Sequence, residues 1–215
     1  RLRRSRVLAA LSVSQPLGGG VVRDFTWAEV GDQIRRMAAH LQAQGWAPGS
    51  RVAILSKNCA WWLMSDLAIW MAGHVSVPLY PTLAAETIRQ ILTHSEARWL
   101  YIGKLDGWAQ QAAGVPAGLP CIELPLAPPT GHPTWDDIVA RTPPLVGRPQ
   151  RRGDDLAMLL YTSGSTGQPK GVMQNFERIT RTTELRNASM HERLGPEVAW
   201  RVLSYLPLAH AYERA

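Results

Sequence analysis

The sequence predicts an α/β fold, in which a largely parallel sheet carries helices on both faces. Helix-like and strand-like segments alternate between residues 26 and 102, and this alternation favours parallel strands joined by crossover helices. The strand-like segments, such as Val52–Leu55, are continuous apolar runs, as expected for strands that are buried on both faces. The chain has 215 residues and is 46% hydrophobic, which is enough for a packed core in one large domain or two small ones.

The first expected helix follows Thr26. Thr26 is a suitable N-cap, and Glu29 three residues later completes a capping box. Apolar residues then recur at helical spacing and predict one buried face, made of Trp27, Val30, Ile34, Met37 and Leu41. The preceding glycines, residues 18–20, are interpreted as a spacer.

The other elements are expected from the same reasoning. The Trp-rich helix over Cys59–Ala72 is interpreted as core. The remaining expected helices are Ala84–His94, Trp135–Ala140 and Phe176–Met190. The expected strands are Val52–Leu55, Val75–Leu79, Trp99–Ile102, Cys121–Leu124, Leu156–Leu160 and Val202–Leu206. The charged segment Arg148–Asp155 is the expected joint between two subdomains, residues 1–150 and 151–215.

A loop rich in Gly, Ser and Thr is the main candidate for chemistry. It reads Tyr-Thr-Ser-Gly-Ser-Thr-Gly-Gln-Pro-Lys-Gly-Val-Met over Tyr161–Met173 and is expected to connect a buried strand to a helix. Its glycines allow several backbone N–H groups to converge on one anion, and its hydroxyls and Lys170 add further donors. The loop is therefore predicted to hold a polyphosphate.

The loop is not a Walker P-loop. Counted from Gly164, that pattern needs Gly at position 169 and Ser or Thr at position 171, where this chain has Pro169 and Gly171. A plain surface connector is the alternative, since Gly, Ser and Thr are ordinary loop residues.

Two motifs carry a resemblance to a known family. The Tyr161–Met173 loop resembles the signature loop of the adenylate-forming enzymes, which include acyl-CoA synthetases, peptide-synthetase adenylation domains and luciferases. The segment Leu206–Arg214, Leu-Pro-Leu-Ala-His-Ala-Tyr-Glu-Arg, is similar to the corresponding motif of long-chain acyl-CoA synthetases, and Gly73–Thr82 also resembles the family. The resemblance implies an N-terminal part of the family's large, AMP-binding domain, with residues 151–215 starting its second subdomain and the small C-terminal domain absent.

The resemblance also implies an activity and its cofactors. Such enzymes use ATP and Mg²⁺ to activate a carboxylate as acyl-AMP and then transfer the acyl group to CoA. Thr162 would contact Mg²⁺ or phosphate, and Lys170 would be a mobile catalytic cation. The pyrophosphate portion of ATP would be wrapped by Ser163, Gly164, Ser165, Thr166 and Gly167. His210 would lie beside the carboxylate and is the second catalytic candidate, although a lone His is otherwise more often part of a core.

Charge and cysteines add few restrictions. The net charge of +6 comes from 23 basic and 17 acidic residues, and part of it lies in the first six residues. Cys59 and Cys121 are far apart and indicate neither a disulfide framework nor a zinc site, which fits a reducing cytosol. The expected partners are fatty acid, ATP and CoA and not nucleic acid; peripheral membrane contact and homo-oligomerisation stay open.

Two other functions remain open at this point. The first is an adenylating enzyme for an aryl acid or an amino acid. The second is a non-enzymatic module that uses the basic start of the chain to bind an anionic surface.

Overall fold

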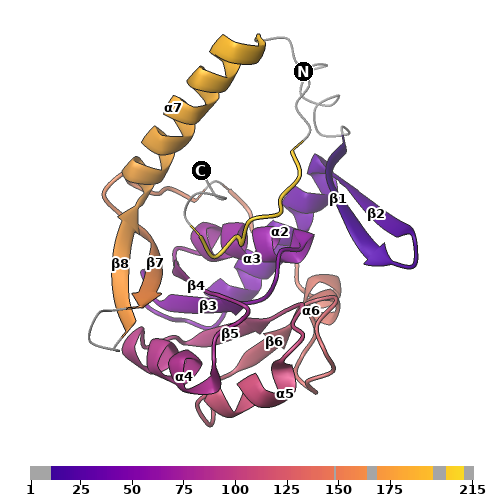
Figure 1. The fold of residues 1–215 in the computed structure, drawn as a ribbon, viewed down its shortest axis with the longest axis vertical. Coiled ribbons are helices and arrows are strands. Elements are labelled where there is room, and N and C mark those ends of the chain that lie inside the picture. The colour runs from indigo at the N-terminus through magenta and orange to yellow at the C-terminus, as the bar shows by residue number, and fades with distance from the viewer. Residues whose placement is uncertain (1–10, 148, 164–168, 196–201, 211–215) are drawn as a thin grey trace.

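The computed structural model describes residues 11–147, 149–163, 169–195 and 202–210. Within them, six strands form one sheet in the order β6-β5-β3-β4-β7-β8, and a separate hairpin, β1–β2, stands beside it (Figure 1). Strands β3 to β7 pair in parallel, while β7 and β8 are antiparallel. The expected α/β class is confirmed.

Most of the expected helices and strands are present, with bounds close to those that the sequence pattern predicts. The strands of the main sheet are β3 (Arg51–Leu55), β4 (Val75–Leu79), β5 (Trp99–Ile102), β6 (Cys121–Glu123), β7 (Leu156–Ser163) and β8 (Pro169–Asn175). The helices are α2 (Trp27–Gln42), α3 (Ala60–Met71), α4 (Ala85–His94), α5 (Trp108–Gln111), α6 (Trp135–Arg141) and α7 (Phe176–Leu194), with the 3-10 turn η1 at Ala112–Gly114. Strand β8, the short helix α5 and the turn η1 were not expected from the sequence.

The capping box of α2 is present as predicted. The Thr26 hydroxyl accepts the Glu29 N–H at 3.2 Å, and the Glu29 carboxylate accepts the Thr26 N–H at 2.7 Å. The predicted apolar face is buried except at Trp27, which is 46% exposed. Trp27 is the first helical residue and lies at the edge of the apolar stripe, so the prediction was wrong for that position.

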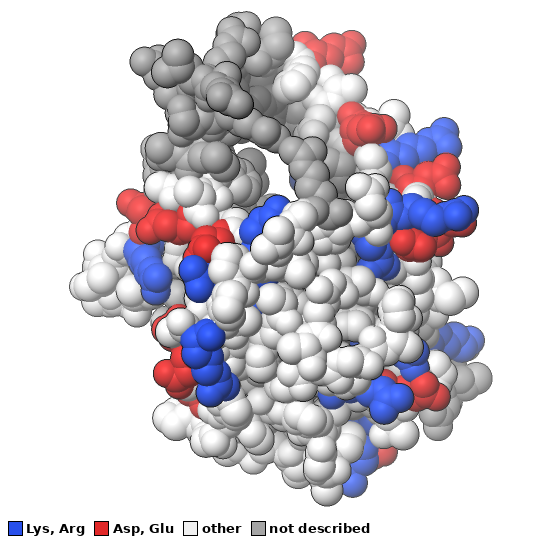
Figure 2. Space-filling view, turned by 180° about the vertical axis from the view of Figure 1, so that it is seen from behind, with Lys and Arg blue, Asp and Glu red and all other residues white. Residues whose placement is uncertain are grey.

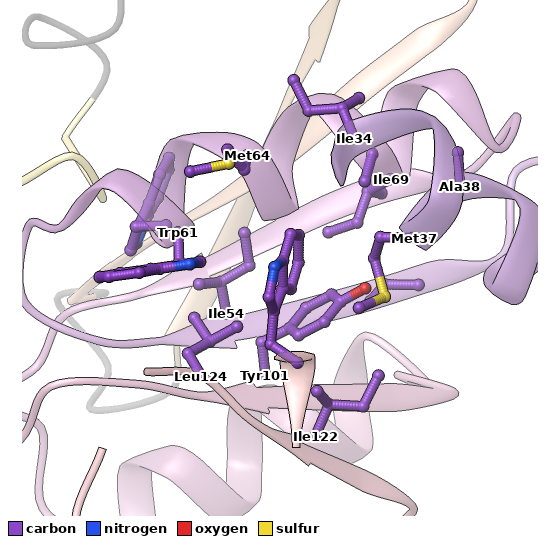
Figure 3. Close-up of a cluster of buried hydrophobic side chains, with 14 of the residues drawn as sticks. Ile34, Met37, Ala38, Ile54, Trp61, Met64, Ile69, Tyr101, Ile122 and Leu124 are labelled. Atoms are coloured by element: carbon purple, nitrogen blue, oxygen red, sulfur yellow. The ribbon is translucent and has the colours of Figure 1, made fainter. Parts of the chain in front are cut away.

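Helices cover both faces of the sheet and create two cores. Helices α2, α3 and α6 pack on one face, and α4 and α5 lie on the other (Figure 1). Successive residues of a strand point to opposite faces, so Ile54 enters the first core and Leu55 the second. Figure 3 shows the first core, where Trp61 and Met64 of α3 lie above Ile54 and Tyr101 of the sheet.

The β1–β2 hairpin, Leu11–Gly18 and Val21–Thr26, replaces the expected spacer. Its turn uses Gly18 and Gly20 at positive φ, a backbone region that glycine enters without strain. The buried Gln15 of β1 accepts the Ala60 N–H at 2.7 Å, at the start of α3. Arg23 of β2 lies over the rings of Phe25 and Trp61, so the hairpin is fastened to α3.

The structure also differs from the sequence prediction near the end of the described chain. Residues 202–206 were expected to form a strand, but they adopt no regular secondary structure and are largely exposed. They pair with no strand of the sheet, and the side chain of Asn58 holds this part of the chain instead. The expected joint near residue 150 lies between α6 and β7, and β7 then joins β4 through the pair Ser76–Met158. The division into two subdomains stays a prediction.

The last helix has little cover. Helix α7 projects away from the sheet in Figure 1, and none of its residues with a described side chain is fully buried. The face shown in Figure 2 carries positive and negative side chains next to one another. Ion pairs in the described part of the chain include Arg36–Asp32 at 2.7 Å and Arg152–Asp154 at 3.0 Å. In the described part of the chain, no helix is both long and apolar enough to cross a membrane.

Candidate phosphate-binding site

The candidate loop lies between two strands, not between a strand and a helix. Strand β7 runs to Ser163, and β8 begins at Pro169 and pairs with it in antiparallel register. Pro169 and Gly171 are poor helix formers, and Pro is tolerated as the first residue of a strand. The helix begins only after Asn175, whose side chain accepts the Arg178 N–H at 3.0 Å as an N-cap. The expectation of a strand-to-helix connection was therefore wrong.

The hairpin places two predicted site residues together. Thr162 is the direct register partner of Lys170 across the β7–β8 pair. Side chains of directly opposed residues in an antiparallel pair lie on the same face, within about 4.5–5.5 Å at their Cβ atoms. Both residues are exposed. The two side chains thus start from neighbouring positions on one face at the base of the loop, from which the hydroxyl of Thr162 and the ammonium group of Lys170 can both reach an anion.

The remaining loop residues are only partly described. Ser163 lies in β7 opposite Pro169. The other predicted phosphate contacts, Gly164, Ser165, Thr166 and Gly167, fall outside the described residues, so their role stays a prediction.

Tyr161 fixes the start of the loop to the rest of the fold. Its hydroxyl lies 2.6 Å from Nδ1 of His94, the last residue of α4, and the two rings meet edge to face at 5.6 Å. Burial raises the pKa of Tyr161, so its hydroxyl stays protonated and available for this hydrogen bond at neutral pH. Opposite Tyr161 stands Gly171, where an added Cβ would lie 3.2 Å from the tyrosine ring. The ring therefore packs directly across the glycine backbone.

The other end of the hairpin is also anchored. The Arg151 guanidinium lies 4.8 Å from the centre of the Phe176 ring and donates to the Leu156 carbonyl at 3.0 Å. Phe176 meets Trp70 of α3 edge to face at 5.3 Å, and the Trp70 indole N–H donates to the Ala157 carbonyl at 2.8 Å. Strand β7 is thus held from both faces of the sheet, which gives the loop a rigid base.

His210 lies on a separate segment, residues 202–210. Its N–H donates to the Pro207 carbonyl at 2.8 Å and closes a turn, and its side chain is exposed. The adjacent Leu208 and Ala209 are buried, at 9% and 4% exposure. The structure thus fixes the backbone at His210 by a turn and two buried neighbours.

Sequence reasoning missed two residues that support the site. These residues are His94 and Asn58, neither of which belongs to a motif that the sequence analysis identifies. An Asn just before a helix is commonly a capping or turn residue. Neither residue carries a local signal, since their partners are 67 and 146–150 positions away.

The described residues fit a phosphate better than a metal ion. The exposed Thr162 and Lys170 offer a hydroxyl and a cation, which suit the phosphates of ATP. No group of three or more His, Cys, Asp and Glu side chains suited to a metal ion occurs in the described part of the chain. Magnesium usually needs one or two carboxylates in addition to phosphate oxygens. A magnesium contact by Thr162 therefore stays a prediction.

Comparison with known proteins supports the motif-based interpretation. The model of the AMP-binding enzyme family matches residues 9–215. A long-chain-fatty-acid–CoA ligase of Mycobacterium tuberculosis, FadD15, is 33% identical over 94% of this chain and 34% of its own length. The peroxisomal long chain acyl-CoA synthetase 6 of Arabidopsis thaliana is 29% identical over 91% of this chain and 30% of its own length. The chain spans about a third of the length of these relatives.

Solved structures show the same fold. An ATP-bound RpMatB-BxBclM chimera superposes with a TM-score of 0.72 at 26% identity, over 95% of this chain and 38% of the chimera. An anthranilate CoA ligase with bound anthranoyl-AMP superposes with a TM-score of 0.67 at 23% identity, over 76% of this chain and 32% of that protein. At 23% identity, the likeness to the anthranilate CoA ligase concerns the fold alone. With the family model matching nearly the whole sequence, the chain belongs to the AMP-binding enzyme family.

Proposed function

We propose that this chain is the N-terminal part of an ATP-dependent long-chain fatty acid–CoA ligase. In the first step, a carboxylate oxygen attacks the α-phosphorus of ATP, the bond to the β-phosphate breaks, and pyrophosphate leaves. In the second step, the CoA thiol attacks the acyl carbonyl, loses its proton, and AMP leaves. The protein would act on small molecules in the cytosol, with contact to a membrane surface as a further part of the proposal.

The pairing of Thr162 with Lys170 is the observation that carries the proposal. As pyrophosphate leaves, negative charge grows on the β and γ phosphates. Preorganised donors that face this charge lower the barrier without having to reorganise. Lys170 supplies a full positive charge, and Thr162 supplies a hydroxyl beside it. Residues 163–167 would add backbone and hydroxyl donors, and bound Mg²⁺ would supply further neutralisation.

The substrate class rests on the sequence relatives. FadD15 and the Arabidopsis synthetase are both named for long-chain substrates. A benzoate CoA ligase and an anthranilate CoA ligase resemble the chain at 24% and 23% identity, which supports the shared fold only. We therefore favour a long-chain fatty acid over an aryl acid, with His210 beside its carboxylate.

No observation favours a non-enzymatic basic module. The basic start of the chain lies in the first ten residues, which are not among the residues that the structure describes. Several described basic side chains are paired with carboxylates, as Arg51 is with Glu96 and Lys57 with Asp106. Paired charges in such a mixed surface leave little net field to attract a polyanion.

The test is pyrophosphate exchange by the full-length protein with a panel of acids. Exchange should depend on ATP and should be fastest with long-chain fatty acids, with benzoate and anthranilate far slower. Fastest exchange with an aryl acid would replace the proposed substrate class. Absence of exchange with every acid would overturn the proposed reaction.

A further inference from the structure

Asn58 makes three hydrogen bonds to a segment almost 150 residues further along the chain. Its side-chain N–H groups donate to the Ser204 hydroxyl at 2.9 Å and to the Leu206 carbonyl at 2.6 Å. Its Oδ1 accepts the Leu208 N–H at 2.8 Å. Both donors of the amide are therefore used, and its oxygen accepts one bond.

The two backbone bonds reproduce the pairing of a parallel strand. In a parallel ladder, one residue bonds the carbonyl and the N–H that flank a single residue of its neighbour. Here the Asn58 amide bonds the Leu206 carbonyl and the Leu208 N–H, which flank Pro207. The Asn58 side-chain amide thus makes the two hydrogen bonds that the backbone of a neighbouring parallel strand would make. Ser204 and Leu206 are thus held by a side chain, although their segment pairs with no strand of the sheet.

The same contact determines where His210 lies. The carbonyl of Pro207, between the two bonded residues, accepts the His210 N–H at 2.8 Å. Leu208 packs into the first core, and Ala209 is also buried. The chain from Leu206 to His210 is therefore fixed by the amide, by two buried side chains and by the turn.

Asn58 is itself held firmly at the carboxyl end of β3. The preceding Lys57 N–H donates to the Lys104 carbonyl at 2.8 Å, after β5. Helix α3, which follows Asn58, is held at its first residue because the Ala60 N–H donates to the side chain of Gln15. Helices α3 and α4 leave the neighbouring strands β3 and β4 toward opposite faces of the sheet (Figure 1). In parallel sheets, ligands bind at the carboxyl ends of strands where the connections diverge in this way.

We propose that Asn58 is a positioning residue that holds residues 204–208 across the carboxyl end of β3 and so places His210 for the carboxylic acid substrate. The positioning follows from the contacts of Asn58, and the link to the substrate rests on the proposed function. Asn58 is not proposed to touch the acid or ATP; it acts through the backbone of Leu206 and Leu208.

Amide hydrogen exchange of the 215-residue chain tests the positioning directly. The reference is the N–H of Leu100, a residue of the second core, which donates to the Pro120 carbonyl. Relative to this reference, Asn58→Ala should speed exchange of the Leu208 and His210 N–H groups by about tenfold or more. Asn58→Asp, of nearly the same shape, should act in the same direction because it loses both donors and sets a carboxylate against the Leu206 carbonyl. Ser204→Ala should have little effect, since the two backbone bonds remain.

Gln111→Ala is the matched control. Like Asn58, Gln111 bonds the backbone of a segment distant in the sequence: its side-chain amide donates to two carbonyls, Pro81 at 2.8 Å and Leu83 at 3.0 Å. Its loss should not alter Leu208 exchange relative to Leu100. Unchanged Leu208 exchange in both Asn58 variants would overturn the proposal, and so would the same relative increase in Gln111→Ala.

Kinetics of the full-length protein test the link to the substrate. Asn58→Ala should raise the KM for the fatty acid several-fold and leave the KM for ATP unchanged, and it should add little to a His210→Ala variant. Equal changes in both KM values, or additive effects of the two substitutions, would overturn the link. A parent protein that makes no adenylate would overturn the proposed function instead, and the exchange result would still decide whether Asn58 positions the segment.

Discussion

The Tyr161 hydroxyl lies 2.6 Å from Nδ1 of His94, so the residue that opens the candidate phosphate loop is tied to the end of α4. The bond crosses from β7 to a helix on the second face of the sheet. It fixes the ring that packs over Gly171, and with it the register that sets Thr162 opposite Lys170.

Tyr161→Phe should therefore lower the free energy of unfolding by about 0.5–1.5 kcal/mol, the net value of one hydrogen bond. His94→Phe should cost a similar amount, and the double variant should cost less than the sum because both remove the same bond. Urea denaturation of the four proteins measures the coupling. Fully additive losses would show that the contact contributes nothing.

The sequence predicts those elements whose signals are local. The capping box of Thr26 and Glu29, and the apolar runs of β3, β4 and β5, have all their determinants within a few residues. The β7–β8 hairpin was missed because its signal is the pairing of Thr162 with Lys170 across the loop. The strand expected over residues 202–206 was wrong because apolar content cannot tell whether a neighbouring strand exists.

In the candidate phosphate-binding site, too, only residues with a local signal can be predicted from the sequence. A motif identifies Thr162 and Lys170, because the chemistry needs those residue types at close spacing. Asn58 and His94 support the site through partners far away in the sequence, so no short pattern reveals them.

Gly114→Ala should destabilise the protein by about 1–3 kcal/mol, the usual cost of overpacking. An added Cβ would lie 2.2 Å from the Ala85 carbonyl oxygen in the first turn of α4, and backbone moves less easily than a side chain. Gly107→Ala is the control, since its nearest neighbour would be 3.8 Å away. Equal urea midpoints for Gly114→Ala and the parent would contradict the close packing of α4 on η1.

Stability should fall as the pH drops below about 6.5, the ordinary pKa of histidine. Burial lowers the pKa of His40 and of His74, with nearby Arg141 and Arg151 acting in the same direction. Below pH 6.5 the unfolded chain therefore binds protons that the folded protein resists, and the loss continues until the folded pKa values are passed.

Urea denaturation between pH 8 and pH 5 measures this effect. His74→Gln should flatten the fall in stability, and adding His40→Gln should flatten it further. If the double variant kept the slope of the parent protein, the two histidines would not be its source.

The isolated 215-residue chain is expected to form no acyl-adenylate. The described residues supply a hydroxyl and an ammonium group but no acidic cluster for Mg²⁺, and the relatives are about three times as long. Fatty-acid-dependent pyrophosphate exchange should be absent from the chain and present in the full-length protein. Exchange by the isolated chain would contradict the proposal that it is only one part of the enzyme.

Lys170 is proposed to act on the phosphates of ATP, and single-turnover kinetics of the two half-reactions of the full-length protein decide whether it does. Lys170→Ala should slow adenylate formation by a factor of about ten to a thousand, the scale of losing one preorganised donor. Thr166→Val is expected to act in the same direction. Lys104→Ala, at another exposed lysine, is the control and should leave this step unchanged. Preformed acyl-adenylate should still react with CoA at close to the parental rate in Lys170→Ala, because pyrophosphate has already left. Equal slowing of both steps, or of neither, would contradict the assignment.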